Sequence, residues 1–212
     1  MRKFTNTTRN LKSTIYTTSC AISKHVGPLA EVYAIEPFKQ TYDCLCKNTA
    51  GLPVKTKKYA IGTEEGEITG TFLPEYTLLS GFHVGNDKEA LELLAGRKLD
   101  KEFSVINETV SCIRLDTFLQ QEGITNKIDV LKIDVEKAEL DVLLSLGSRL
   151  ADVQCVCAEV HEPNLVRFKE ILEARYGTGN VWVSDKDLPL FALDEKPAEW
   201  DASLNTYIIF AS

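Results

Sequence analysis

Short apolar runs alternate with helical patterns along the chain from residue 31 onward. The runs are typical of buried strands, and apolar residues that recur every three or four positions indicate helices with one buried side. Strands are therefore predicted at 31–35, 54–61, 68–72, 110–115, 128–135, 153–160, 181–183 and 207–210. Helices are predicted to begin near Phe38, Asp87, Asp116, Leu140 and Asn164.

This alternation predicts an α/β fold of the Rossmann-like type, with a mostly parallel sheet and helices on both faces. The near-continuous apolar runs at 128–135 and 153–160 support it, because strands covered on both faces have little polar alternation. The segment 207–210 is expected to close the sheet, as an antiparallel partner.

Four of the predicted helices have an apolar stripe that we expect to face the sheet. The stripes consist of Phe38, Tyr42, Leu45 and Cys46; Ala90, Leu91 and Leu94; Leu140, Leu143 and Leu144; and Leu165, Phe168, Ile171, Leu172 and Tyr176. Asn164 is expected to cap the last of these helices, because an asparagine side chain can accept a hydrogen bond from the first free amides.

The first 25 residues differ from the rest. Residues 1–30 hold five basic residues and no acidic one, and threonine is frequent there. This start is either similar to an organelle transit peptide in composition or an unstructured or misassigned N-terminus. We expect a poorly ordered or divergent segment at 1–25 and one domain at 26–212. Residues 14–26 can form a first helix with Ile15, Ala21, Ile22 and Val26 inward, but the strand before it is expected to be lacking or degraded.

Composition narrows the classes of partner. The net charge is −7, from 24 basic and 31 acidic residues, so nucleic acid is not an expected partner. No apolar run reaches the roughly eighteen residues of a membrane helix, and no secretory signal is visible. The six cysteines lack the C-x-x-C spacing of common zinc sites. Reduced thiols in a cytoplasmic protein without a metal site are therefore expected.

Polar residues stand at the carboxyl ends of three predicted strands. Glu36 follows 31–35, Asp134 lies at the end of 128–135, and His161 follows 153–160. Ligands of parallel sheets bind at that edge. Glu36 is suited to hold a ribose, Asp134 to face a cation or reacting group, and His161 to take a proton from a substrate hydroxyl. Each also has a structural explanation, as a residue that caps a turn or the next helix.

Four longer segments carry a recognisable pattern. They are EVYAIEPF, KKYAIGTEEGEITGTF, SCIRLDTFLQQEGITNKIDVLKIDVEKAELDVLLSLG and CAEVHEP. With them the chain, from about residue 30 to 211, resembles the FkbM family of methyltransferases. LKIDVEKAELDVL is the most specific part, and Lys137 stands there where the family usually has glycine. Together with residues 76–82, this form resembles the O-methyltransferase domains of polyketide and peptide synthetases.

The resemblance implies a class I methyltransferase fold that binds S-adenosylmethionine. It implies cofactor contacts from Glu36 at the ribose, Pro37 and Phe38 near the adenosine, and Ile61 and Gly62 by the adenine. Asp134 is then expected near the methyl-transfer site and His161 as the base or substrate contact, with Lys137 a weaker substrate-side candidate. The implied reaction is O-methylation of a small-molecule hydroxyl, for which the protein aligns the groups and helps to remove a proton.

One element of that family is not visible. Its first strand and loop read V-x-D-V-G-A-N-x-G, whereas Gly27 is the only glycine of this chain before residue 51. Those glycines let the backbone approach the cofactor where a Cβ would clash. The chain is then either a truncated or mis-spliced product or a degenerate relative, and the alternative function is a catalytically inactive binding or interaction module. A dinucleotide oxidoreductase is a further alternative, but its G-x-G-x-x-G is absent too.

Overall fold

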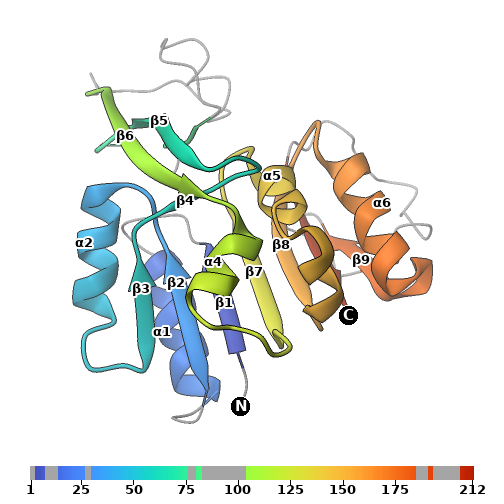
Figure 1. Cartoon of the computed structure of the whole chain (residues 1–212). Coiled ribbons are helices and arrows are strands. Elements are labelled where there is room, and N and C mark those ends of the chain that lie inside the picture. Colours follow the sequence, from blue (N-terminus) through green and yellow to red (C-terminus); the bar gives the residue numbers. More distant parts are fainter. Residues whose placement is uncertain are drawn as a thin grey trace.

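The fold is built on two β-sheets, which the computed structural model describes over residues 3–7, 14–26, 30–75, 80–82, 104–184, 191–192 and 206–212 (Figure 1). The large sheet contains β1 (Lys3–Thr7), β2 (Glu31–Ile35), β3 (Val54–Lys57), β7 (Val130–Asp134), β8 (Val156–His161), β9 (Val181–Ser184), β10 (Phe191–Ala192) and β11 (Thr206–Ala211). Their order is β10-β9-β11-β8-β7-β1-β2-β3. The strands from β3 to β8 in this order are parallel, and β11 runs antiparallel to both β8 and β9.

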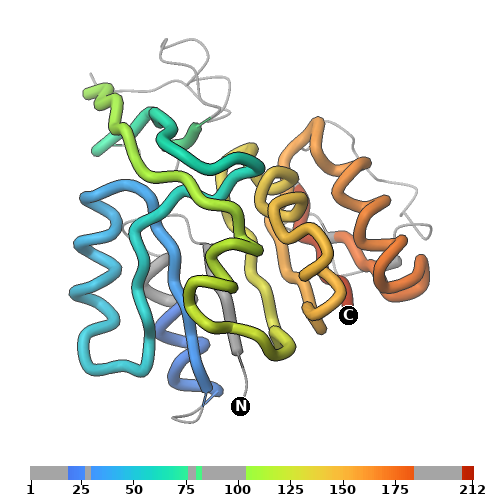
Figure 2. The backbone as a smooth tube through the Cα atoms, viewed as in Figure 1, coloured from blue at the N-terminus to red at the C-terminus, as the bar shows by residue number. Residues whose placement is uncertain are grey.

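The small sheet contains β4 (Ala60–Ile61), β5 (Gly66–Phe72) and β6 (Ile106–Ile113), in the order β4-β6-β5. It lies beyond the carboxyl ends of β2 and β3, at the top of Figure 1. The tube in Figure 2 shows how the chain leaves the large sheet after β3, passes through β4 and β5, and returns along β6 into the next helix. The segment between β3 and α4, called the excursion below, thus places the small sheet over the edge where parallel sheets bind ligands.

Helices cover both faces of the large sheet. They are α1 (Thr14–Val26), α2 (Lys39–Asn48), α4 (Leu115–Gln121), α5 (Glu139–Leu144) and α6 (Leu165–Tyr176), with 3-10 turns at Gly147–Asp152 and Thr178–Asn180. In Figure 1, α4 lies in front of the sheet and α1 behind it. Strand β2 serves two cores, because Tyr33 and Ile35 pack with α4 whereas Ala34 packs with Leu45 of α2. The predicted fold class is confirmed.

A strand, β1, lies where the sequence suggested that the strand before the first helix would be lacking or degraded. β1, with the sequence KFTNT, pairs in parallel with β2 on one side and β7 on the other, so it is the central strand of the parallel part. Among the α1 residues whose side chains are described, 19–26, Ser19 and Ser23 are buried, one turn apart, whereas Ala21 is exposed. The expectation that Ala21 faces inward is therefore wrong, because the helix turns Ser19 and Ser23 inward instead.

The predicted strand 54–61 is in fact two strands in different sheets. β3 ends at Lys57 and β4 begins at Ala60. Between them, the Nζ of Lys58 lies 3.1 Å from a carboxylate oxygen of Glu108 on β6, and the Tyr59 ring lies edge-on to Phe118 of α4. Both contacts come from segments far along the chain, so apolar alternation alone could not show the break.

Helix α5 does not bury the whole stripe that its spacing predicts. Val142 and Leu143 are buried, but Leu144 is 43% exposed, so that part of the prediction is wrong. The inner position of the first turn belongs to Glu139, which is fully buried and hydrogen-bonded. The helix predicted to begin at Asp87 lies outside the described residues.

Candidate functional site

The carboxyl ends of β2, β1, β7 and β8 form one edge of the large sheet, called the site edge below. Glu36 follows β2, Asp134 ends β7 and His161 ends β8. The residues just before Glu36 and Asp134 both pair with Thr7 of the strand between them. Two strand spacings separate the backbones of Glu36 and Asp134, about 10 Å. The three polar residues singled out in the sequence therefore share this edge.

The site edge contains the point at which the strand order reverses. From β1 the chain continues to β2 and β3 on one side, and later to β7 and β8 on the other. Ligands of doubly wound sheets bind at such a point, outside the carboxyl ends of the strands. The segment that follows β1 there, residues 8–13, has the sequence TRNLKS and lies outside the described residues.

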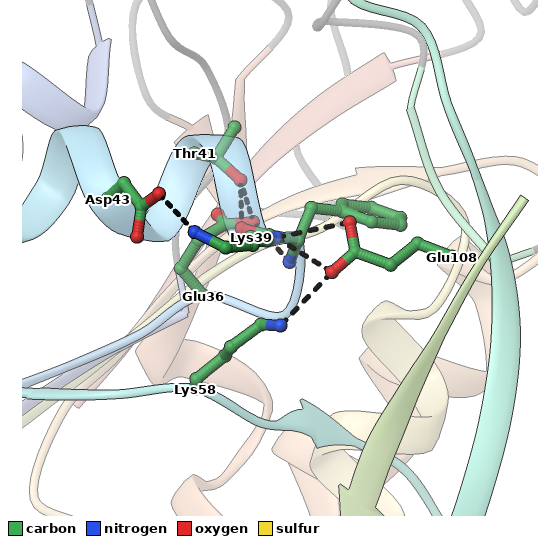
Figure 3. A network of polar contacts seen from close by, with 7 residues as sticks. Glu36, Lys39, Thr41, Asp43, Lys58 and Glu108 are labelled. Carbon is green, nitrogen blue, oxygen red and sulfur yellow. Dashed lines mark hydrogen bonds and ion pairs between the residues drawn. The ribbon is translucent and has the colours of Figure 1, made fainter. Parts of the chain in front are cut away.

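Glu36 is fixed by the turn that leads into α2 (Figure 3). Its side chain is buried, and its Oε1 accepts hydrogen bonds from the Phe38 amide at 3.0 Å and the Thr41 hydroxyl at 2.5 Å. Burial raises the pKa of the carboxyl to about 8, although both hydrogen bonds act in the opposite direction. The group is therefore held in one orientation, in surroundings that favour its neutral form.

Phe38 joins an aromatic cluster with two residues of the excursion. Its ring lies 5.5 Å from that of Phe72 and stacks on Phe82 at 5.3 Å, with an interplanar angle of 12°. A Cβ at Gly70 would come within 2.9 Å of Phe38 and 2.7 Å of Phe82, so the cluster requires glycine at this position. Pro37 is half-buried beside it.

Ile61 and Gly62 belong to the small sheet. Ile61 is the last residue of β4 and pairs with Ile113 of β6, and the Gly62 amide donates to the Ile113 carbonyl at 3.2 Å. A Cβ at Gly62 would lie 2.9 Å from the Sγ of Cys112. Glycine here thus permits close packing inside the small sheet, and a contact of Gly62 with adenine stays a prediction.

Asp134 is buried and paired within its own strand. Lys132 lies two residues earlier, on the same face of β7, and its Nζ is 3.2 Å from the Oδ2 of Asp134. The same Nζ donates to the carbonyl of Ile133 at 3.2 Å. β7 therefore places the ammonium group of Lys132 beside the carboxylate of Asp134 at the site edge.

His161 lies between two buried glutamates. Its Nδ1 is 2.7 Å from Oε1 of Glu139, and its Nε2 is 3.2 Å from Oε2 of Glu136. Glu139 also accepts the Lys137 amide at 3.0 Å and the Asn164 side-chain amide at 3.3 Å. Because all these partners of Glu139 meet it through nitrogen, we assign the proton of the imidazole to Nδ1, as the donor to that carboxylate.

Three of these partners were not singled out as site residues. Glu136 and Glu139 flank Lys137 in DVEKAE, and two acids so close to a strand end were the available signal. Asn164 is the N-cap residue of α6 as expected, but its side chain makes no capping hydrogen bond, because its amide instead donates to the Lys137 carbonyl at 3.0 Å and to Glu139. Over the described ranges, no three His, Cys, Asp or Glu residues are arranged to hold a metal ion.

The turn between β7 and α5 depends on an unusual backbone conformation. Lys137 has φ 61°, in the left-handed region that favours glycine. This conformation directs its amide to Glu139 and its carbonyl to Asn164, so the backbone of one residue organises the surroundings of His161.

No helix in the described part of the chain is long and apolar enough to cross a bilayer.

Strand order, the reversal point and the polar residues at the strand ends together define a domain of the class I methyltransferase type. The family model described as the methyltransferase FkbM domain matches residues 6–191. The chain therefore belongs to the FkbM methyltransferase family.

Curated relatives agree with this assignment. The 31-O-demethyl-FK506 methyltransferase FkbM of Streptomyces tacrolimicus is 32% identical over 183 residues, which cover 78% of this chain and 68% of that protein. The hexuronic acid methyltransferase AglP of Haloferax volcanii is 30% identical, over 62% of this chain and 48% of that protein. The AMB antimetabolite synthetase AmbE of Pseudomonas aeruginosa is 30% identical, over 64% and 7% respectively. The chain thus corresponds to only part of each relative.

Among solved structures, the human methyltransferase 10 domain containing protein is matched at a TM-score of 0.41 and 11% identity. The match covers 100% of this chain and 70% of that one. A likeness at this level adds nothing to the fold described above.

Proposed function

We propose that this chain transfers a methyl group from S-adenosylmethionine to the hydroxyl oxygen of a small molecule. The observation that carries the proposal is the buried carboxyl of Glu36, fixed through one oxygen at the end of β2, next to the point where the strand order reverses. A carboxyl in this position can bind both hydroxyls of a ribose.

The charge of the site edge supports this choice of cofactor. Asp134, Glu136 and Glu139 are each at most 4% exposed, and they lie at the end of β7, in the turn after it and at the first residue of α5. An edge rich in acids favours a ligand with a positive sulfonium and disfavours the pyrophosphate of a dinucleotide. The same observation therefore supports S-adenosylmethionine and counts against the oxidoreductase alternative.

The residues near Glu36 suit an adenosine group. In this proposal Glu36 holds the ribose, Pro37 and Phe38 contact the adenosine, and Ile61 and Gly62 contact the adenine. S-adenosylmethionine supplies a methyl group already activated on a positively charged sulfur. The chain itself has to bind and orient the cofactor and the acceptor and to exclude water from them. The small sheet over the site edge is suited to excluding water.

His161 and Asp134 are the proposed groups at the reaction centre. The Glu139 carboxylate accepts a hydrogen bond from Nδ1–H of His161, which leaves Nε2, beside Glu136, to accept the proton of the substrate hydroxyl. Asp134, on the adjacent strand, stabilises positive charge beside the reacting atoms. The acceptor is proposed to be a small molecule because two relatives are named for 31-O-demethyl-FK506 and for hexuronic acid.

Cofactor binding is tested by titration calorimetry. We expect S-adenosylmethionine to bind the wild type, Glu36→Ala to weaken binding by at least about tenfold, and Glu170→Ala to leave it unchanged. Glu170 is a suitable control because it is an exposed glutamate on α6. Absence of binding at millimolar ligand would refute the proposal and favour a non-catalytic binding module, whereas binding of NADH alone would favour an oxidoreductase.

Methyl transfer is tested with S-adenosylmethionine that carries a ¹³C-methyl group. 31-O-demethyl-FK506 and glucuronic acid serve as acceptors, and ¹³C NMR distinguishes a methyl ether from a methyl ester. A methyl ether that His161→Gln suppresses agrees with the proposal. A methyl ester, or transfer that does not depend on His161, would contradict the assigned acceptor group or base.

A further inference from the structure

Helix α2 lacks a cap of its own at the end nearest the cofactor residues. The helix begins at Lys39, its N-cap residue Phe38 offers no side-chain hydrogen bond, and its first turn has no acid. The first amides of a helix have no partner inside the helix. Glu36 accepts from the Phe38 amide and the Thr41 hydroxyl, but the Lys39 amide needs another acceptor.

That acceptor comes from the small sheet. Glu108 lies on β6, and its Oε1 and Oε2 are 2.9 Å and 3.2 Å from the Lys39 amide. The Nζ of Lys58 donates to the same carboxylate at 3.1 Å. Figure 3 shows the Glu108 side chain extended from its strand toward Lys39 and Lys58. A residue 69 positions away in the sequence thus caps α2.

We propose that Glu108 is a positioning residue for the cofactor: it holds the turn 36–38 in place by capping α2 from the small sheet. The inference rests on the proposed function, because Glu36 and Phe38 are its cofactor contacts. Glu108 binds the amide just after Phe38, while Phe72 and Gly70 of the same sheet pack on the Phe38 ring. The small sheet therefore holds this turn at two points, the backbone amide of Lys39 and the side-chain ring of Phe38.

Position and charge can be separated at Glu108. Its negative charge disfavours the ionised form of Glu36 and so contributes to the raised pKa of Glu36, after the larger effect of burial. A carboxylate could also attract a cationic cofactor directly. A positioning role predicts that the hydrogen bond to Lys39 matters, whereas a direct electrostatic role predicts that only the charge matters.

Lys39→Pro removes the amide that Glu108 binds. Proline is favoured at the first position of a helix, where its missing N–H has no partner within the helix. Phe38 already has φ −78° and ψ 134°, the extended conformation that a residue before proline prefers. The substitution should therefore leave the helix intact while it makes the cap unnecessary.

The decisive experiment is a double-mutant cycle on S-adenosylmethionine affinity, measured by calorimetry. We expect Glu108→Ala to weaken binding about fivefold to tenfold in the wild type and to have almost no effect in the Lys39→Pro protein. Equal losses in both backgrounds, or no loss in either, would overturn the proposal. Glu67→Ala is the matched control, since Glu67 is an exposed glutamate on the adjacent strand β5.

Two further measurements keep the result interpretable. Glu108→Gln retains an oxygen that can accept from Lys39, so it should bind within about twofold of the wild type even if Glu108→Ala folds poorly. Amide exchange followed by NMR should be faster at Lys39 in Glu108→Ala and unchanged in Glu67→Ala. Unchanged exchange refutes the cap itself. If the wild type binds no S-adenosylmethionine, the proposed function and the cofactor role of Glu108 both fail, and the exchange rates alone decide on the cap.

Discussion

Glu36 links the acidity of one carboxyl to the stability of the chain. Burial raises its pKa from the ordinary 4.5 to about 8 in the folded protein. Between these pH values the folded state binds a proton that the unfolded state has released. The contribution of Glu36 therefore favours folding less and less as the pH rises through this window, by at most about 5 kcal/mol in total.

Glu36→Gln should remove this dependence, because an amide does not ionise. We expect the variant to match the wild type closely in urea unfolding at pH 5 and to be more stable by about 2 kcal/mol or more at pH 8.5. Glu170→Gln, at an exposed position, controls for the general effect of removing an acid. If Glu36→Gln loses as much stability as the wild type between pH 5 and pH 8.5, the assignment is contradicted.

Lys137 carries backbone strain that glycine would relieve. A left-handed φ costs a residue with a Cβ about 1 kcal/mol, although glycine also gives the unfolded chain more freedom. Lys137→Gly is therefore expected to raise the free energy of unfolding by about 0.5 kcal/mol, measured with urea. A clear loss of stability would mean that the lysine side chain makes a favourable contact of its own.

Glu139 is the acceptor on which the His161 surroundings depend. Glu139→Ala would leave the Lys137 amide, the Asn164 amide and the His161 Nδ1–H without this partner in a buried place. We expect a loss of about 3 kcal/mol in chemical unfolding, and a smaller loss for Glu139→Gln. The ¹⁵N shifts of the His161 ring should report a proton on Nδ1 in the wild type. A ring protonated only on Nε2 would be inconsistent with this account.

At the scale of elements, the small sheet depends on close contact with the aromatic cluster. Gly70→Ala would place a methyl group within 3 Å of the Phe38 and Phe82 rings, so one of them has to shift. We expect a loss of about 1–3 kcal/mol and a lower melting temperature by calorimetry. Gly179→Ala is the control, because no atom lies within 4 Å of the added Cβ. Equal melting temperatures for both variants would show that the contact is not tight.

The sequence predicted those elements whose signal is local. β2, β8, α6 and the antiparallel β11 lie where apolar periodicity placed them, and so do Glu36, Asp134 and His161 at the strand ends. It failed where a distant segment decides the local structure. At the break after β3, Lys58 pairs with Glu108 of β6, and on the inward side of α5 Glu139 pairs with Asn164. Long-range pairs of this kind leave no periodic trace along the chain.

At the scale of the whole molecule, β1 joins the two halves of the large sheet. It is polar, and the sequence suggested that the start of the chain is divergent, but its backbone pairs with both β2 and β7. We expect removal of residues 1–13 to abolish cooperative thermal unfolding by circular dichroism and to cause aggregation in size-exclusion chromatography. A monomer that melts like the wild type would show that the segment is dispensable, as a cleaved leader would be.

Strand β11 has a consequence for how the protein is made. Residues 206–211 insert between β8 and β9, two strands that the ribosome has finished well before. Until this late segment emerges, each of those strands has an edge whose hydrogen-bonding groups lack their final neighbour, and such edges readily recruit other chains. Nascent polypeptides halted before residue 206 should therefore be the species most in need of a chaperone.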